Sequence, residues 1–177
     1  MKSIIYIALL SFVVFKSFGQ GDQTKGQVKL GNGSLFLIKT EQITLEAALQ
    51  LTHMARAKAT QLGKEVSVAV LDADGQTIVL SRGEGIGVHN TEAARRKAFT
   101  AASTKTATLI LARNAKSNPD TENLTSLGEL LLLGGGLPLY HDGKVIGAIG
   151  IAGGGNPEND DLIGRSASIP QADITAR

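Results

Sequence analysis

The 177-residue chain carries 18 lysines and arginines against 16 aspartates and glutamates, three histidines and no cysteine. The lack of cysteine in the sequence excludes a disulfide framework, a thiolate metal site and a lipid-modified cysteine. The near balance of charge, without a basic stripe interleaved with aromatic residues, gives no support for nucleic-acid binding.

Residues 1–20 have the order of a secretory signal peptide. Lys2 precedes an apolar run over residues 4–15, and the small residues Ser17 and Gly19 follow it. The run is shorter than the roughly 20 apolar residues of a spanning helix. We expect cleavage after residue 19 or 20, which leaves 16 basic and 16 acidic residues in an exported, periplasmic or extracellular protein. An uncleaved anchor is the alternative.

Residues 21–40 are rich in Gly, Lys and Gln, and we expect a loose arm that ends in a short strand at the letters SLFLI. Thr44 then has the place of a helix N-cap. Apolar residues follow it at helical spacing until Gly63 closes the helix.

A first hairpin is predicted next. Segments 66–72 and 77–82 are strand-like, and Asp74-Gly75 between them is a strong turn signal. From about residue 91 to 113 the pattern is helical again, long enough for one helix or for two in series. A polar loop follows.

The last third of the chain predicts a second hairpin, with strands over 137–140 and 144–152 and the letters HDG at the turn. Gly147 and Gly150 fall inside the second strand. Glycines at such positions indicate close approach by another element of the backbone.

A last helix is expected to begin near Asp160, and residues 171–177 are expected to be a tail. Each hairpin follows helical material, which predicts an antiparallel sheet flanked by helices. The fold class is therefore α+β, in one domain over residues 41–170.

A glycine-spaced loop, RGEGIGV at residues 82–88, leads into a basic, alanine-rich helix. Its glycines match neither the dinucleotide-binding fingerprint nor a P-loop. His89, just before the helix, is the best of the three histidines for a ligand or acid–base role. We expect His53 to be partly buried beside the first helix and His141 to be solvated. No zinc-type histidine pair or nucleophile elbow is present in the sequence, so a hydrolase is not indicated.

Four residues of the following helix are separated by three, four and four positions: Lys97, Thr100, Thr104 and Thr108. In a continuous helix they share one face, opposite the alanines that would pack on the sheet. A cation and three hydroxyls in a row could hold a carboxylate. Alternatively, each threonine bonds back to the carbonyl one turn earlier. The residues alone leave both interpretations open.

Three segments, taken in order, resemble the GlcG/HbpS family of haem-binding, haem-degrading domains over about residues 44–168. They read VSVAVLDADGQTIVLSRGEG, ARRKAFTAAS and LGGGLPLYHDGKVIGAIGIAGGG. The resemblance implies a profilin-like antiparallel sheet of about five strands, assembly into homo-oligomers and haem binding in several members. It implies no single activity, and haem degradation stays an option.

The resemblance also suggests a haem site at the loop and the following helix. The exposed N–H groups around Gly85, together with Arg82 and Lys97, would then hold the haem propionates. The resemblance points to Thr100 or Thr108 as a haem-iron contact. His89 is the stronger ligand by its chemistry, because histidine is a common axial ligand of haem.

Two functions follow from these observations. The first is an exported protein that captures, buffers or senses haem, with a membrane sensor as a possible partner and no stable membrane insertion after leader removal. The second is a small-molecule enzyme that uses the same cleft, with His89 and Glu92 as an acid–base pair. The two residues are three positions apart at the start of a helix, so their side chains could meet.

Overall fold

The computed structural model describes residues 36–177. The predicted leader and residues 21–35 of the arm lie outside the described residues. Residues 36–39 belong to a unit separate from Thr40–Arg177. Phe36, Leu37 and Ile38 are exposed and in no strand, so the described part of SLFLI does not form the expected strand. No helix within residues 36–177 has the length and apolar character that crossing a membrane requires.

Helix α1, Leu45–Gln61, begins and ends where the sequence predicts. The Thr44 side chain accepts a hydrogen bond from the Ala47 N–H at 3.2 Å, as an N-cap does. Gly63 takes a left-handed φ of 65°, and its N–H bonds back to Thr60 O. A left-handed glycine that satisfies the last carbonyls is a common helix stop.

The sheet has six strands, one more than the approximate count expected. Their order across the sheet is β2-β1-β4-β3-β6-β5, and every neighbouring pair is antiparallel. The bounds are β1 Ser67–Asp72, β2 Thr77–Ser81, β3 Gly136–His141, β4 Lys144–Ala152, β5 Ser168–Ile169 and β6 Ile174–Ala176. The two predicted hairpins are β1–β2 and β3–β4.

The C-terminal residues are part of the sheet, so the expected tail is wrong. A 3-10 turn, η2 Pro170–Ala172, follows β5 and leads into β6. Strand β6 pairs with both β3 and β5. Its Ile174 and Ala176 are buried, and this burial explains why so short a strand is held.

The helical region after the glycine loop divides in two: α2, His89–Thr104, and α3, Thr108–Ser117. Lys105 ends α2 in a left-handed conformation with φ 51°. Thr108 therefore starts a new helix, and the expected single face from Lys97 to Thr108 is wrong. The predicted polar loop contains α4 Pro119–Glu122 and a 3-10 turn, η1 Asn123–Ser126. The last helix, α5 Pro157–Arg165, starts three residues before the expected position because Asn156 caps it.

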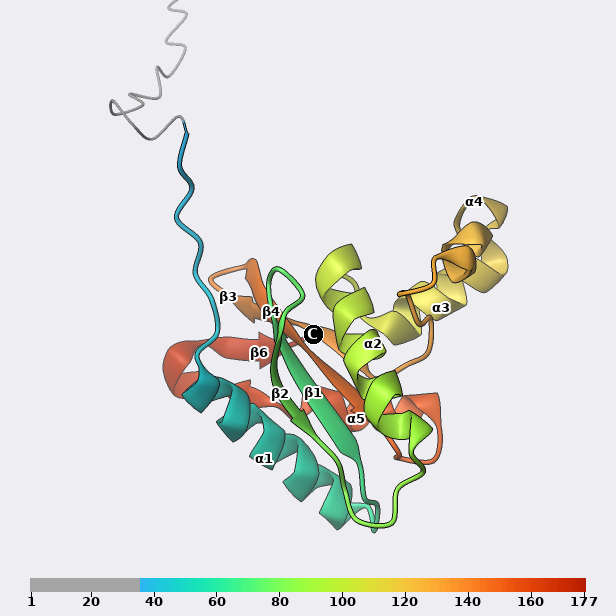
Figure 1. Cartoon of the computed structure of the whole chain (residues 1–177), viewed down its shortest axis with the longest axis horizontal. Helices are drawn as coiled ribbons and strands as arrows, with labels where there is room; N and C mark the ends of the chain where they lie inside the picture. Colours follow the sequence, from blue (N-terminus) through green and yellow to red (C-terminus); the bar gives the residue numbers. More distant parts are fainter. Residues whose placement is uncertain (1–35) are drawn as a thin grey trace, which may run out of the picture. The chain divides into compact units, whose positions relative to one another are not determined.

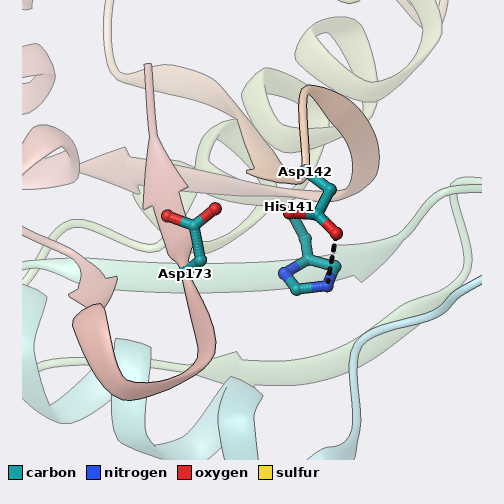
Figure 2. Close-up of side chains that lie close together, drawn as sticks. All are labelled: His141, Asp142 and Asp173. Atoms are coloured by element: carbon teal, nitrogen blue, oxygen red, sulfur yellow. Dashed lines mark ion pairs between the residues drawn. The ribbon is translucent and has the colours of Figure 1, made fainter.

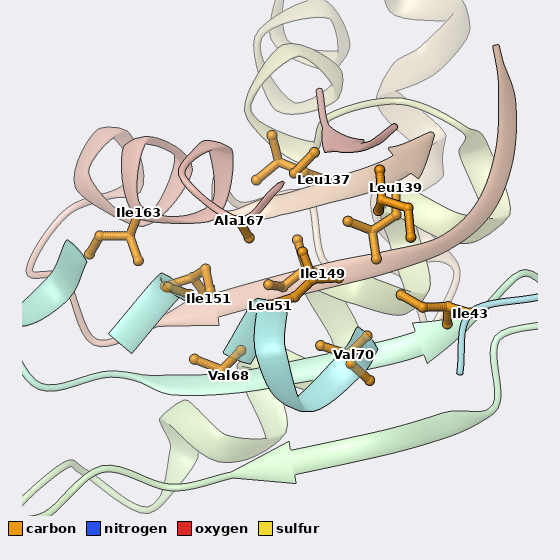
Figure 3. Packing of buried hydrophobic residues seen from close by; sticks show 14 of the residues in the cluster. Ile43, Leu51, Val68, Val70, Leu137, Leu139, Ile149, Ile151, Ile163 and Ala167 are labelled. Atoms are coloured by element: carbon orange, nitrogen blue, oxygen red, sulfur yellow. The ribbon is translucent and has the colours of Figure 1, made fainter. Parts of the chain in front are cut away.

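Helices cover both faces of the sheet (Figure 1). Helices α1 and α5 cover one face, where large aliphatic side chains such as Leu51, Ile149 and Ile163 pack together (Figure 3). Helix α2 covers the other face through alanines, including Ala94 and Ala98. Strand residues alternate between these two clusters, as the two-residue period of a strand requires. The arrangement confirms the α+β class.

Glycines let α2 lie very close to the sheet. A Cβ at Gly150 would overlap Ala94 O, and one at Gly136 would overlap Lys97 O. The predicted close approach at Gly150 is therefore confirmed, with α2 as the approaching element. The same closeness carries Lys97 into the interior.

Candidate functional site

The glycine loop delivers an open helix N-terminus, as predicted. Gly85 has a left-handed φ of 71° and is exposed, whereas Gly83 is buried against Val66 O. Helix α2 begins at His89, and its N-cap Val88 supplies no side-chain cap. The first turn of α2 thus presents backbone N–H groups without a capping side chain, a setting that favours anions.

A pocket of about 340 Å³ lies at this helix start. One side of the pocket is the first turn of α2, with His89 and Asn90. The other side is the segment Gly153–Pro157, which runs from the end of β4 into α5. The N-termini of α2 and α5 both border the pocket, so both helix dipoles favour negative charge in it. The apolar lining comes from Ala93, Leu133, Ala152 and Pro157.

A buried ion pair lies at the pocket wall. Lys97 Nζ is 2.7 Å from Asp160 Oδ2 and donates a second hydrogen bond to Ile151 O at 2.9 Å. Asp160 Oδ1 accepts from the Gly154 N–H at 2.7 Å. The side chains are 1% and 8% exposed. Burial lowers the pKa of Lys97 and raises that of Asp160, whereas the attraction between the two charges acts in the opposite direction on both.

The expected meeting of His89 and Glu92 does not occur. The Glu92 carboxylate is held by Arg95, with Nη2 to Oε1 at 2.7 Å, and Arg95 also reaches Glu129. The hydrogen bonds from Arg95 lower the pKa of Glu92, so this carboxylate favours the charged, paired form. The His89 side chain is exposed at the rim of the pocket.

The threonines of the predicted site make internal hydrogen bonds. Thr100 Oγ1 donates to Arg96 O at 2.7 Å and accepts from the Leu131 N–H at 2.8 Å. Thr108 Oγ1 donates to Leu133 O and accepts from the Gly136 N–H, both at 2.8 Å. Both side chains are buried. Thr104 bonds back to Thr100 O. The threonines therefore fasten the segment before β3 to α2 and α3.

Of the six predicted site residues, the pocket brings together two, His89 and Lys97. Arg82 and Gly85 are exposed on the loop before α2 and are not among the residues that line the pocket. Thr100 and Thr108 are likewise outside the lining. The prediction for His53 is wrong, because that residue lies on the exposed side of α1.

A second group of metal-ligating side chains lies at the far end of the β3–β4 hairpin. One nitrogen of His141 and one oxygen each of Asp142 and Asp173 lie within 4.8 Å of one another. Figure 2 shows the three side chains together, with a dashed line marking the ion pair between the His141 ring and the Asp142 carboxylate. His141 Nδ1 bonds Ala172 O at 2.8 Å. Asp142 and Gly143 both have positive φ, as in a type I′ turn. The His141 bond thus ties this turn to the turn before β6.

A larger pocket of about 470 Å³ lies along α3 and α4. Its lining residues include Ala115, Lys116 and Pro119 but no histidine or aspartate. Its titratable lining groups are Lys116 and Glu122, and its lining lacks the histidine that the pocket at His89 provides as a haem ligand.

Residues 43–168 match the family model of the HbpS-like haem-degrading proteins. This stretch covers more than two thirds of the chain and holds the glycine loop, α2, both hairpins and α5. The chain belongs to the HbpS-like family.

Solved structures of HbpS-like proteins share the fold. A double mutant of HbpS from Streptomyces reticuli aligns with a TM-score of 0.70 and 35% identity, over 77% of this chain and 91% of that one. A PduOC–haem complex aligns with a TM-score of 0.67 and 31% identity, over 77% of this chain and 99% of that one.

A longer relative contains the same region. The corrinoid adenosyltransferase PduO of Salmonella typhimurium is 36% identical over 115 residues, which are 64% of this chain. They make up 34% of the relative, so this chain spans about a third of that enzyme's length.

The sequence interpretation missed Asp160, which pairs with Lys97 at the pocket wall of this HbpS-like domain. It also missed the wall formed by Gly153–Pro157. The letters GNPEND carried a usable signal, since Asn-Pro after glycines marks a helix N-cap and N1. That signal locates α5 but does not reveal that Asp160 reaches Lys97, 63 positions away.

Proposed function

We propose that this chain binds haem at the pocket between α2 and Gly153–Pro157. The observation that carries the proposal is a pocket bordered by two helix N-termini, a lysine and a histidine, in a family with a solved haem complex. The dipoles and the lysine favour an acidic ligand, and the apolar lining favours a flat hydrophobic one. Haem combines the two.

The residues present fit such a ligand. Lys97 has three N–H donors, of which two are used by Asp160 and Ile151 O, so the third would bond a propionate that reaches this almost fully buried side chain. The uncapped first turn of α2 supplies further donors. His89 at the rim would hold the iron through its imidazole, and haem would supply the redox-active metal. Leu133 and Ala152 would contact the macrocycle and exclude water.

The proposal assigns smaller roles to the four predicted site residues outside the pocket lining, which are Arg82, Gly85, Thr100 and Thr108. Arg82 and Gly85 lie on the exposed loop that leads to α2, where Arg82 would attract propionates from solution. Thr100 or Thr108 would have to give up present hydrogen bonds in order to approach the iron. The proposal therefore favours His89 as the ligand.

A haemin titration of His89→Ala tests the ligand. Replacement of an axial ligand changes the iron coordination, so the Soret band of the bound haem should move. His53→Ala, on the exposed side of α1, is the matched control and should leave the band unchanged. A parent-like band in His89→Ala, together with a shifted band in Thr100→Val or Thr108→Val, would reject His89 in favour of threonine.

We also propose that the protein is exported and captures, buffers or senses haem outside the cytoplasm. The support is the signal-peptide order of residues 1–20, which lie outside the described residues. Protein from the native host should have an intact mass that starts near Gln20 or Gly21. A full-length mass in the membrane fraction would contradict export.

Self-association, and contact with a membrane sensor, belong to the same proposal. The glycine-rich second hairpin and the alanine-rich α2 do not offer a free surface for a second copy where Gly150 packs against Ala94 within the chain. The remaining support is the family resemblance and the exposed Ile110, Leu127 and Leu133. Light scattering at micromolar concentration should give a mass above that of one chain, and a monomeric mass would reject assembly.

The alternative of an acid–base enzyme has less support. Its proposed partner for His89 is Glu92, and that carboxylate is engaged by Arg95. A pair used for proton transfer needs its two groups within hydrogen-bond reach of the substrate. If the parent protein does not bind haem, the result would favour this acid–base enzyme over haem binding.

A further inference from the structure

We propose that Asp160 competes with the carboxylate of the ligand for Lys97 and so limits the affinity of the pocket for anions. This inference rests on the proposed function. The inference goes beyond the proposed function because it names an internal charge, that of Asp160, which sets how tightly a haem propionate is held. Asp160 would be a regulating residue of the pocket and not a ligand-binding one.

The geometry gives Lys97 an internal partner. The 2.7 Å contact between Lys97 Nζ and Asp160 Oδ2 lies at the pocket wall, and both residues are among its lining. Because the two charges cancel, the wall has no net charge from this pair. The positive helix ends and the open N–H groups of α2 then provide the remaining attraction for an anion.

An arriving carboxylate meets two opposing effects at this wall. The third N–H of Lys97 attracts it, while the neighbouring Asp160 repels it. Both charges are almost fully buried, so water screens neither of them well. Among the other residues that line the pocket, His89 is the remaining titratable group, and it is exposed at the rim. Lys64 lies beside Gly155 and is also exposed.

Asp160 also has a structural role, and the two roles predict opposite results. Asp160 Oδ1 accepts from Gly154 N–H, while Lys97 holds Ile151 O, so the pair anchors both ends of the segment that turns into the pocket wall. If anchoring were the whole role, any change at Asp160 would loosen the wall and weaken binding. If Asp160 competes with the ligand, removal of its charge strengthens the binding of an anion.

The variant Asp160→Asn separates these roles, because its amide oxygen can still accept from Gly154 N–H, while the charge and the acceptor for Lys97 are both gone. The probes are haemin, with two propionates, and haemin dimethyl ester, in which both are neutral. We expect Asp160→Asn to bind haemin about ten- to hundredfold more tightly than the parent, the scale of one poorly screened charge. Affinity for the ester should be unchanged.

Three further variants complete the test. Lys97→Met removes the cation and leaves Asp160 without its counter-charge, so its haemin affinity should fall below that of the parent. Lys97→Met/Asp160→Leu has no charge at the wall and should fall between Lys97→Met and Asp160→Asn. It also keeps the test valid if Asp160→Asn folds poorly, since an apolar pair often replaces a buried ion pair without loss of stability. Asp161→Asn is the control, because Asp161 pairs with Arg165 and is not in the pocket lining.

A thermal-shift measurement gives a second readout. Asp160→Asn leaves a buried lysine without its counter-charge, so the unliganded variant should melt below the parent. Haemin should then raise its melting temperature more than it raises that of the parent, because a tighter ligand stabilises more. A mere loss of anchoring would reduce this ligand-induced rise.

The outcomes distinguish the inference from the function on which it rests. If the parent binds haemin and Asp160→Asn binds it more weakly, or if both probes change equally, competition is overturned while haem binding stands. If the parent binds neither probe, the proposed function falls and the inference falls with it. Tighter haemin binding in Asp160→Asn, with unchanged ester binding and a parent-like Asp161→Asn, supports the inference.

Discussion

At the scale of single residues, small groups decide how close α2 comes to the sheet and what it holds in place. The hydrogen atom of Gly150 leaves room for Ala94 O, and the hydroxyl of Thr108 joins the start of α3 to the start of β3. Both contacts are buried and tightly packed, so the addition or deletion of one group should lower the free energy of unfolding. The Gly150 contact sets how closely α2 lies on the sheet, and so where Lys97 of that helix lies.

Gly150→Ala should destabilise the fold, because the added methyl group would overlap Ala94 O. Overpacking of this kind costs about 1–3 kcal/mol in the free energy of unfolding. Gly128→Ala is the control, since a Cβ there meets nothing within 4 Å. Urea unfolding should show a lower midpoint for Gly150→Ala alone. Equal midpoints for the two variants would contradict the close approach of α2.

Thr108→Val should lower the free energy of unfolding by about 1–3 kcal/mol, because Leu133 O and the Gly136 N–H lose a buried partner. Thr104→Val removes a single bond back to Thr100 O and should cost less. The Soret band of bound haem should be unchanged in both variants if the threonines act structurally. A band shifted in Thr108→Val would show instead that its hydroxyl contacts the iron.

Local chemistry made part of the site predictable. A histidine after a glycine loop and a lysine on the next helix are visible in the sequence, and the pocket contains both His89 and Lys97. The internal partner of Lys97 was not predictable, because Asp160 is brought near by the order of strands and not by local sequence. The sequence alone does not distinguish a buried, paired lysine from an exposed lysine.

At the scale of elements, regular patterns with strong end signals were predicted well, and short or interrupted ones were not. Thr44 and Gly63 enclose α1, and the turn at Asp142-Gly143 joins β3 and β4. The sequence left one helix or two in series open after the glycine loop, and it did not locate the break at Lys105, because a non-glycine residue in the left-handed region carries no clear sequence signal. Strand β6 has three residues, too few for a period of two to stand out.

Removal of residues 174–177 tests the importance of β6. Truncation exposes the edge of β3 and takes away the buried Ile174 and Ala176. Burial of one isoleucine alone is worth about 1.5–3 kcal/mol, so the midpoint of urea unfolding should fall clearly. Removal of Arg177 alone keeps both buried residues and should have a smaller effect. A truncated chain as stable as the parent would contradict the place of β6 in the sheet.

At the scale of the whole molecule, the two faces of the sheet are packed differently and have different roles. The face under α1 and α5 carries large aliphatic side chains and provides most of the core. The face under α2 is lined by alanine and glycine, and its closeness to the helix brings the α2 N-terminus and Lys97 beside the end of β4. The pocket is thus a consequence of how the helix lies on the sheet.

The central claim is that this pocket binds haem, and a haemin titration of the purified chain tests it most directly. The absorbance near the Soret band is recorded against haemin concentration, with the same additions to buffer subtracted. We predict a band distinct from that of free haemin, which saturates at a fixed ratio of haem to chain and weakens in Lys97→Met. A spectrum that is the sum of free haemin and protein at every concentration would contradict the claim.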